Sequence, residues 1–223
     1  MNPFCLLVVA KAPVPGFAKT RLCPPATATE AAEIAAASLL DTLDAVAATP
    51  GALPVVAVTG DLGAAAGGDE IRRALRAATV LAQRGRDFGE RLANAHADTA
   101  ARHPGRAVVQ IGMDTPQVTA ELLADAAERL AHASSGAVLG PAEDGGWWAL
   151  GLRDPRRARV LAEIPMSRPD TGELTRGAIG SSGTLRTLSD VDTMADARRV
   201  AELAPHGRFA AAVARIREAE TAR

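Results

Sequence analysis

The sequence predicts an α/β fold: a mostly parallel β-sheet that carries helices on both of its faces. Three observations lead to this prediction. Short β-branched runs alternate with longer helical patterns, the runs are apolar throughout, and no internal repeat or low-complexity linker divides the chain. Such alternation implies right-handed crossovers between parallel strands. The length of 223 residues fits a single domain, which we expect to span residues 1–223.

Five apolar runs are expected to form strands that are buried on both faces of the sheet. The pattern changes after about residue 147, where two further strands are expected with a segment rich in proline and arginine between them. The expected strands are Leu6–Ala10, Val55–Thr59, Thr79–Ala82, Ala107–Ile111, Ala137–Leu139, Trp147–Leu152 and Thr184–Leu188.

Helices are expected where apolar residues recur on one helical face. A capping-box signature of Thr27 and Glu30 marks the start of the first helix. The four expected apolar faces are Leu39, Leu40, Leu43 and Val46; Leu122, Leu123, Ala126, Ala127 and Leu130; Met194, Ala197, Val200 and Ala201; and Phe209, Val213 and Ile216.

Composition argues against several classes of protein. The net charge is −1, so no overall field favours binding to nucleic acid or to an anionic membrane. No apolar run approaches membrane-spanning length, and the run Phe4–Ala10 is too short for a signal sequence. We therefore expect a soluble, cytoplasmic protein whose partners include neither nucleic acid nor a membrane.

Cysteine and histidine show no metal-ligand spacing. Cys5 and Cys23 are expected to be reduced, partly buried thiols. The histidines are expected to lie on the surface or to have hydrogen-bond partners, and they are His96, His103, His132 and His206.

The loop after the first strand carries three cations, Lys11, Lys19 and Arg21, beside a turn at Gly16. Because ligands of parallel α/β sheets bind beyond the carboxyl ends of the strands, this position favours phosphate binding. Arginine makes forked contacts to phosphate oxygens, and lysine supplies a mobile charge. No glycine directly precedes Lys19, so the loop is not a P-loop. The alternative is an ordinary solvated basic loop.

Acidic residues follow two later strands. Asp114 ends the strand Ala107–Ile111 and is followed by Pro116, which cannot extend the ladder, so its carboxylate should face the ligand crevice. Carboxylate oxygens suit Mg²⁺, although a turn or a helix cap is the alternative role. Asp144 precedes two glycines in an open loop, where a tight turn is the alternative.

A third acidic element, residues 190–196, precedes the helix that begins near Met194. Thr193 and Asp196 have the spacing of a helix cap, so part of this element is structural.

Segment 10–22 resembles the opening pattern Ala-Lys-x-Pro-x-Pro-Gly-x-x-Lys-Thr-Arg-Leu of the selenodomain-associated transferase family. That family belongs to the glycosyltransferase-A-like nucleotide transferases, and the loop is more distantly similar to phospholactate guanylyltransferase and the molybdenum-cofactor nucleotidyltransferases. Segments 83–91, 140–152 and 190–196 extend the resemblance over most of the chain.

The resemblance implies a single-domain glycosyltransferase-A-like fold, as in nucleotide-diphospho-sugar transferases, and a set of site residues. Asp114 matches the aspartate that binds metal and nucleotide, Asp192 matches the second metal carboxylate, and the ion is Mg²⁺, with Mn²⁺ as an alternative. Lys11, Lys19, Arg21 and Asp144 are the implied catalytic residues, with Asp144 orienting the acceptor or joining the metal. The implied nucleotide-binding residues are Ala10, Lys11, Gly16, Lys19, Arg21, Gln83, Gly89, Arg91 and Asp114.

Gln83 could contact a base edge and Arg91 a phosphate or an acidic acceptor, with ordinary loop hydrogen bonding as the alternative for both. Several positions depart from the family pattern. Trp147 and Trp148 replace an aromatic pair of tyrosines, and one of the two is expected in the core. Phe88, Met166 and Met194 replace a leucine, a tryptophan and a proline of the family pattern.

The function expected from these features is nucleotidyl transfer from a nucleoside triphosphate to a small phosphorylated or hydroxyl acceptor, with release of pyrophosphate. Glycosyl transfer from a nucleotide-diphosphate sugar is the close alternative, because a fold does not decide between reactions. A non-catalytic nucleotide-binding module is a third hypothesis. The partners expected are a nucleotide donor and a small acceptor, and the oligomeric state is left open.

Overall fold

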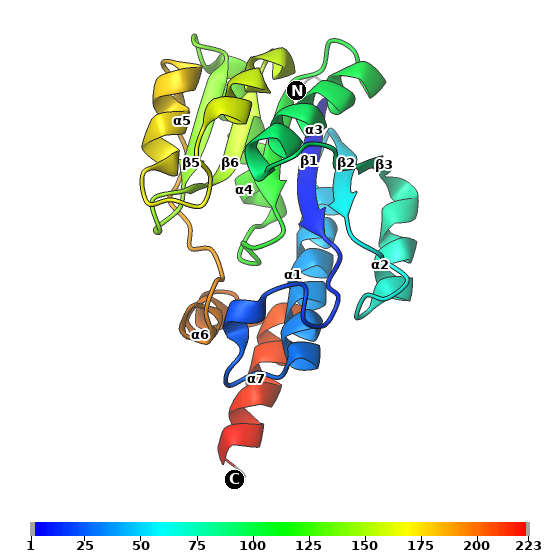
Figure 1. The fold of residues 1–223 in the computed structure, drawn as a ribbon. Helices are drawn as coiled ribbons and strands as arrows, with labels where there is room; N and C mark the ends of the chain where they lie inside the picture. Colours follow the sequence, from blue (N-terminus) through cyan, green and yellow to red (C-terminus); the bar gives the residue numbers. More distant parts are fainter. Residues whose placement is uncertain (1–2, 222–223) are drawn as a thin grey trace.

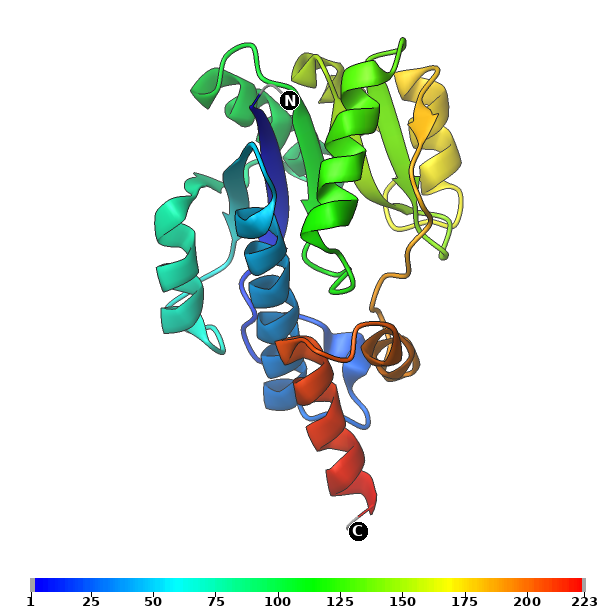
Figure 2. The same ribbon diagram turned by 180° about the vertical axis from the view of Figure 1, so that it is seen from behind.

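A computed structural model describes residues 3–221 as one seven-stranded sheet with helices packed on both faces (Figures 1 and 2). The strands are β1 (Phe4–Lys11), β2 (Ala52–Thr59), β3 (Thr79–Ala82), β4 (Val108–Gly112), β5 (Ala137–Pro141), β6 (Trp147–Leu152) and β7 (Gly183–Thr184). The α-helices are α1 (Ala28–Ala48), α2 (Gly68–Ala74), α3 (Phe88–Arg102), α4 (Ala120–His132), α5 (Thr171–Ile179), α6 (Met194–Leu203) and α7 (Arg208–Thr221). Short 3₁₀ helices are η1 (Thr20–Leu22), η2 (Leu75–Ala77) and η3 (Pro155–Glu163).

The strand order is β3-β2-β1-β4-β6-β5-β7. Strand β6 is antiparallel to its neighbours β4 and β5, and every other pairing is parallel. The predicted class, a mostly parallel α/β sheet with helices on both faces, is therefore confirmed. The carboxyl ends of all strands except β6 meet at one edge, where the loops after β1, β4 and β5 lie.

Two apolar cores cover the two faces of the sheet. One core joins the sheet to α1, α2 and α4, seen in front in Figure 2, and includes Leu39 and Leu123. The other joins it to α3, η3 and α5 on the face seen in Figure 1, and includes Leu92 and Leu161. The capping box of Thr27 and Glu30 is present at the start of α1, as predicted.

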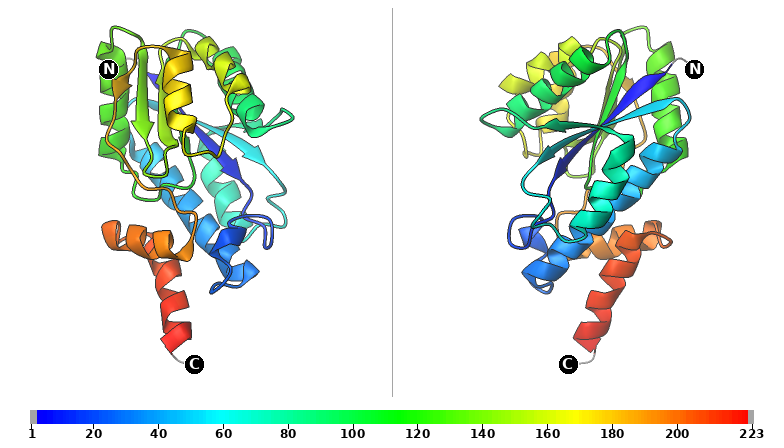
Figure 3. Two further views of the ribbon diagram at one scale, coloured as in Figure 1. Left: turned by 60° about the vertical axis from the view of Figure 1, so that its left-hand side comes forward. Right: turned by 90° about the vertical axis from the view of Figure 1, so that its right-hand side faces the viewer.

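A third apolar cluster lies beyond the sheet edge and joins α6 and α7 to η1 and α1 (Figure 3). Arg208 at the start of α7 forms ion pairs with Asp41 and Asp44 of α1 at 3.3 and 2.5 Å, and with Glu70 of α2 at 3.3 Å. These contacts hold the start of α7 against α1 and α2.

The structure corrects several details of the sequence prediction. Strand β3 is an edge strand and exposes 47% of Val80, so it is not buried on both faces. Strand β7 covers only Gly183–Thr184, although Leu188 still forms an isolated parallel bridge with Ala142. Helices α2, α3 and α5 were not predicted. No helix within residues 3–221 combines the length and apolar character needed to cross a membrane.

Of the tryptophan pair, Trp148 belongs to the core and donates from its indole nitrogen to the Arg186 carbonyl at 2.8 Å. His96 differs from the expectation of a surface or hydrogen-bonded histidine, because it is fully buried between α3 and the sheet. Neither ring nitrogen meets hydrogen-bond geometry within the described residues. Burial lowers its pKa to about 4, and the neighbouring Gln110 amide opposes the shift only in part.

We expect His96 to make the protein less stable in acid. Its folded pKa of about 4 lies below the unfolded value of 6.5, so the unfolded chain binds more protons between these values. The free energy of unfolding should be highest above pH 6.5 and should fall by about 3 kcal/mol toward pH 4 on this account. Urea denaturation of His96→Leu should lack this part of the decline. The exposed His206→Leu variant should keep this decline. If the unfolding free energy fell equally with pH in both variants, the effect could not be assigned to His96.

Two helical glycines should respond to alanine with opposite signs. A Cβ at Gly89 would lie 2.3 Å from the Leu161 carbonyl oxygen, so Gly89→Ala must separate α3 from η3. The cost should be about 2 kcal/mol of unfolding free energy. A Cβ at Gly177 in α5 meets nothing within 4 Å, so Gly177→Ala should stabilise by up to about 1 kcal/mol. Thermal and urea denaturation measure both, and similar effects would refute the packing argument.

Candidate active site

Residues 188–192, here called the strap, run from β7 toward α6 across the carboxyl edge of the sheet. Its first residue is bonded to the β5 end on both sides: Leu188 N–H donates to Pro141 at 3.1 Å, and the Leu188 carbonyl accepts from Glu143 N–H at 3.0 Å. The strap therefore extends the sheet edge past the last residue of β7.

The other side of the strap is bonded to the loop after β4. Gln117 donates from its side chain to the Ser189 carbonyl at 2.7 Å, and Val191 N–H donates to the Asp114 carbonyl at 3.0 Å. Asp114 and the strap are thus fixed to each other through the main chain, although they lie far apart in sequence.

Lys19, in the β1 loop, contacts both the β4 loop and the strap. Its Nζ lies 3.0 Å from Asp114 Oδ2 and 3.7 Å from Asp192 Oδ1, and it also donates to the Val191 carbonyl. Only 12% of the lysine side chain is exposed, against 42% of Asp114 and 48% of Asp192. The backbone of Lys19 is left-handed at φ 51°, a conformation that non-glycine residues adopt rarely outside constrained sites. The predicted residues Lys19, Asp114 and Asp192 therefore converge on one point.

The electrostatics of this cluster are strongly coupled. Burial works to lower the pKa of Lys19, but the charges of Asp114, Asp192 and Asp190 outweigh it, and the pKa is raised. The lysine is therefore a fixed cation. Burial, followed by the charges of Asp114 and Asp144, raises the pKa of Asp190 to about 7, against the opposing effects of the Thr115 hydroxyl and of Lys19.

The other two cations of the β1 loop lie at different places. Arg21 Nη1 is 3.2 Å from Asp192 Oδ2, and 75% of its side chain is exposed, so it lies at the rim of the cluster. Lys11 is exposed and lies over the ring of Phe17, with its Nζ 3.7 Å from the ring centroid. Gly16, at φ 74°, turns the loop between them. Lys19 and Arg21 therefore contact the acids, whereas Lys11 lies against an aromatic ring of the same loop.

Asp144 occupies an Asx turn beside the cluster. Its Oδ1 accepts from Gly146 N–H at 2.8 Å, and the side chain is exposed. A Cβ at Gly145, which has φ 88°, would lie 1.9 Å from the Pro169 carbonyl oxygen, and the Gly145 carbonyl accepts from Gly172 N–H at 2.8 Å. The first turn of α5 thus fixes this loop. The backbone at Asp144 therefore forms the tight turn that was the alternative prediction. The Asp144 carboxylate nevertheless stays exposed.

Four other predicted residues lie outside the cluster. Gln83 donates from Nε2 to the carbonyls of Ala10 and Ala57 at 2.8 and 2.9 Å, so this nitrogen joins the ends of β1 and β2. Among the described residues, Arg91 makes one long contact, to the Gly85 carbonyl at 3.4 Å. Ala10 is buried in β1, and Gly89 packs against η3.

Sequence reasoning missed the residues that hold the Asp114 loop. Ser38 of α1 is buried, and its hydroxyl donates to the Met113 carbonyl at 2.6 Å. The Met113 sulfur accepts from Lys11 N–H at 3.2 Å, and Thr115 donates to Asp190 Oδ1 at 3.1 Å. The sequence did show Asp190, as the first residue of the acidic element 190–196. No sequence signal marked Ser38, because a serine on a helix has no unique role.

The cluster suits one divalent cation held jointly with a phosphate ligand. Asp114 and Asp192 converge and are each about half exposed, and further acidic charge lies nearby at Asp190 and Asp144. Within the described residues no three His, Cys, Asp or Glu side chains form a complete ion site. Mg²⁺ commonly takes one or two carboxylates and completes its shell with phosphate and water, so two aspartates fit it.

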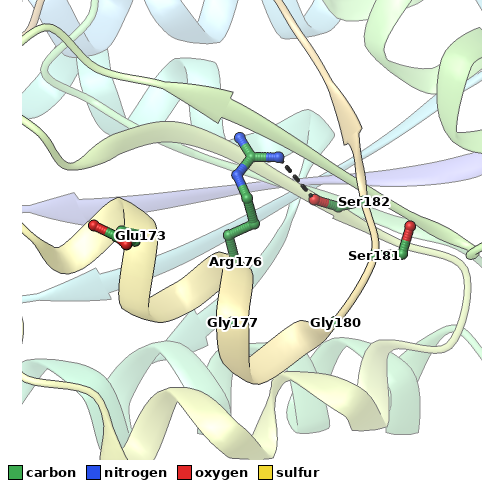
Figure 4. A pocket seen from close by; sticks show the side chains of 6 residues that line it. All are labelled: Glu173, Arg176, Gly177, Gly180, Ser181 and Ser182. Atoms are coloured by element: carbon green, nitrogen blue, oxygen red, sulfur yellow. Dashed lines mark hydrogen bonds between the residues drawn. The ribbon is translucent and has the colours of Figure 1, made fainter.

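A hollow with different chemistry lies elsewhere. It measures about 480 Å³ and is an open groove at the far end of α5, lined by Glu173, Arg176, Gly177, Gly180, Ser181 and Ser182. Arg176 points toward Ser182 there and donates to its hydroxyl at 3.2 Å (Figure 4). The groove shares no residue with the acid cluster, whose chemistry marks the candidate active site.

Comparison with known proteins agrees with this fold. A family model described as "Uncharacterized protein conserved in bacteria (DUF2064)" matches residues 42–168. No curated protein matches the chain.

Three solved structures illustrate the similarity. A protein from Desulfovibrio desulfuricans G20, provisionally named a nucleotide-diphospho-sugar transferase, is 28% identical, with a TM-score of 0.80 and 98% of each chain covered. A 4-diphosphocytidyl-2C-methyl-D-erythritol synthase is 17% identical, with a TM-score of 0.60 over 92% of this chain and 99% of that one. A CMP:2-keto-3-deoxy-manno-octonic acid synthetase complexed with CTP is 10% identical, with a TM-score of 0.53 and the same coverage. The last two share the fold alone.

We expect Ser38→Ala to loosen the Asp114 loop. The variant loses a 2.6 Å buried hydrogen bond and leaves the Met113 carbonyl without this donor, which should cost about 1–2 kcal/mol of unfolding free energy. Thr42→Ala, one turn later in α1, is the matched control. Its hydroxyl donates at 2.8 Å to a carbonyl within the same helix, so its loss should cost less than about 1 kcal/mol. If urea denaturation showed the same loss of unfolding free energy in both variants, the Ser38 contact would not stabilise the Asp114 loop as proposed.

Proposed function

We propose that this chain, which belongs to the DUF2064 family of bacterial proteins, transfers a nucleotide from a nucleoside triphosphate to a small acceptor and releases pyrophosphate. The contact that supports this reaction is the convergence of Lys19, Asp114 and Asp192 at the carboxyl edge of the sheet. Ligands of parallel α/β sheets bind at this edge. A cation beside two carboxylates can hold a polyphosphate together with its counter-ion.

Each residue of the site would have a role that follows from its position. Lys19 is fixed and largely buried, so its charge acts where water screens it least. Arg21 at the rim and Lys11 over Phe17 are the other two cations of this loop, and they would contact the outer phosphates of a triphosphate. Asp114 and Asp192 would hold Mg²⁺, or Mn²⁺, which when bound neutralises phosphate charge and orients the leaving group.

Catalysis would depend on positioning and on electrostatics. The acceptor oxygen attacks the α-phosphorus while pyrophosphate leaves on the opposite side, and no covalent bond to the enzyme forms. Hydrogen bonds from Ser38 and from the strap hold the backbone of Met113 and Asp114 in place before substrate arrives. Such preorganisation lowers the barrier because the protein does not reorganise during the reaction.

Glycosyl transfer from a nucleotide-diphosphate sugar is the second candidate. The similarity to the Desulfovibrio protein, at 28% identity over 98% of each chain, favours it, because that protein is provisionally named for such donors. In this reaction Asp144, which is exposed, would accept a proton from the acceptor hydroxyl. Pyrophosphate release from a triphosphate supports the first reaction, and nucleoside-diphosphate release from a sugar donor supports the second.

A non-catalytic nucleotide-binding role makes a different prediction. It requires binding without turnover and nucleotide affinity in Mg²⁺ that Asp114→Ala leaves unchanged. A thermal-shift screen of nucleotides with and without Mg²⁺ would identify the donor class before any acceptor is known.

We expect Asp114→Asn and Asp192→Asn each to lower turnover of the nucleotide donor at least about 100-fold, because each removes one charge from the pair. Release of pyrophosphate or of nucleoside diphosphate measures the loss. The Mg²⁺-dependent part of the thermal shift with nucleotide should disappear in both variants.

Asp98→Asn provides the matched control for these variants. Asp98 forms an ion pair with Arg84 at 2.8 Å on the surface, away from the cluster. Its turnover should stay within about twofold of the wild type, because exposed ion pairs contribute little. Full activity in Asp114→Asn, with the control behaving as expected, would refute the proposed site.

A further inference from the structure

The charged residues around the candidate site indicate what charge the acceptor carries, and this inference rests on the proposed function. Four aspartates lie in or beside the site, Asp114, Asp144, Asp190 and Asp192. Lys19 and Arg21 are paired with Asp114 and Asp192, and Lys11 lies over Phe17. The carboxylates of this region outnumber the two cations paired with them, and the donor phosphates add further negative charge.

The contacts of Lys19 leave little of its charge for an acceptor. Its ammonium faces Asp114, Asp192 and the Val191 carbonyl, and the side chain is largely buried. On the proposed reaction any contact it exchanges goes to the donor phosphates.

Cations beside the Asp144 turn are already paired. Arg199 of α6 contacts Glu143 at 2.5 Å and Asp196 at 3.1 Å. Arg168, in the segment that packs on the turn, makes a forked contact to Asp170 at 2.9 and 2.8 Å. Both guanidiniums therefore already have carboxylate partners, so an acceptor phosphate at this turn would meet positive charge that is partly neutralised.

The Asp144 carboxylate has one oxygen available to an acceptor. Oδ1 accepts from Gly146 N–H, whereas Oδ2 makes no hydrogen bond within the described residues. The backbone that carries it is fixed, because Gly145 is packed against the Pro169 carbonyl. A fixed, exposed carboxylate oxygen accepts a hydrogen bond from a hydroxyl group and repels a phosphate.

We infer that the acceptor is an uncharged hydroxyl compound, such as a polyol or a sugar, and not a phosphate ester, with its reacting hydroxyl bonded to Asp144 Oδ2. The acceptor oxygen forms a bond to the α-phosphorus. The bond from that phosphorus to the bridging oxygen breaks, and the electron pair leaves on pyrophosphate. The hydroxyl proton passes to Asp144 and then to solvent, so Asp144 acts as a general base.

Matched acceptors test this inference with the intact chain of residues 1–223. Glycerol and glycerol 3-phosphate, erythritol and erythritol 4-phosphate, and glucose and glucose 6-phosphate are compared with Mg²⁺ and each nucleoside triphosphate. Pyrophosphate release and product mass are measured. The uncharged member of the active pair should have a kcat/KM at least about tenfold higher, because like charges brought together are unfavourable.

Variants of the turn separate charge from structure. Asp144→Asn should reduce turnover of the hydroxyl acceptor about 100-fold, shift the preference toward the phosphate ester, and leave the nucleotide dissociation constant within about twofold. Asp61→Asn is the matched control, because Asp61 is exposed and accepts from Gly63 N–H at 2.7 Å in the same kind of turn. It should change none of these values.

The outcomes distinguish the two levels of inference. Preference for the phosphorylated member, or an unchanged preference in Asp144→Asn, would overturn the acceptor assignment while leaving nucleotidyl transfer intact. Failure to consume any triphosphate with every acceptor would contradict the proposed function, and the acceptor assignment with it.

Discussion

The ammonium of Lys19 between two carboxylates is the contact on which the candidate site depends. A largely buried cation is costly unless opposite charges and hydrogen-bond acceptors surround it. Asp114, Asp192 and the Val191 carbonyl meet this need from two other segments of the chain. Because a partly buried ion pair loses stability when one partner is absent, the β1 loop, the β4 loop and the strap must assemble together.

The C-terminal part of the chain makes this assembly possible. The sheet alone would place Asp114 at its edge without a partner acid. The strap returns across that edge, and α6 and α7 hold it by packing on α1 and η1, which follow directly from the β1 loop. The helices beyond the sheet in Figure 3 therefore serve the site, because they bring Asp192 back to the segment that carries Lys19.

Sequence patterns predicted the parts of the fold that depend on local chemistry. The apolar runs gave most strands within a few residues, and the capping box of Thr27 was correct. Asp114 was identified because it follows a buried strand. The missed features depend on distant neighbours: the exposure of Val80 follows from its edge position, and the burial of His96 follows from α3 packing on the sheet. Ser38 has a role only because Met113 lies against it in space.

Lys19 contacts both acids, and this has a consequence for donor binding. On the proposed reaction a divalent ion would compete with the ammonium for the same carboxylates, so the lysine must transfer its contacts to the phosphates. The metal and the phosphates would therefore bind cooperatively, because neither alone satisfies both the acids and the lysine.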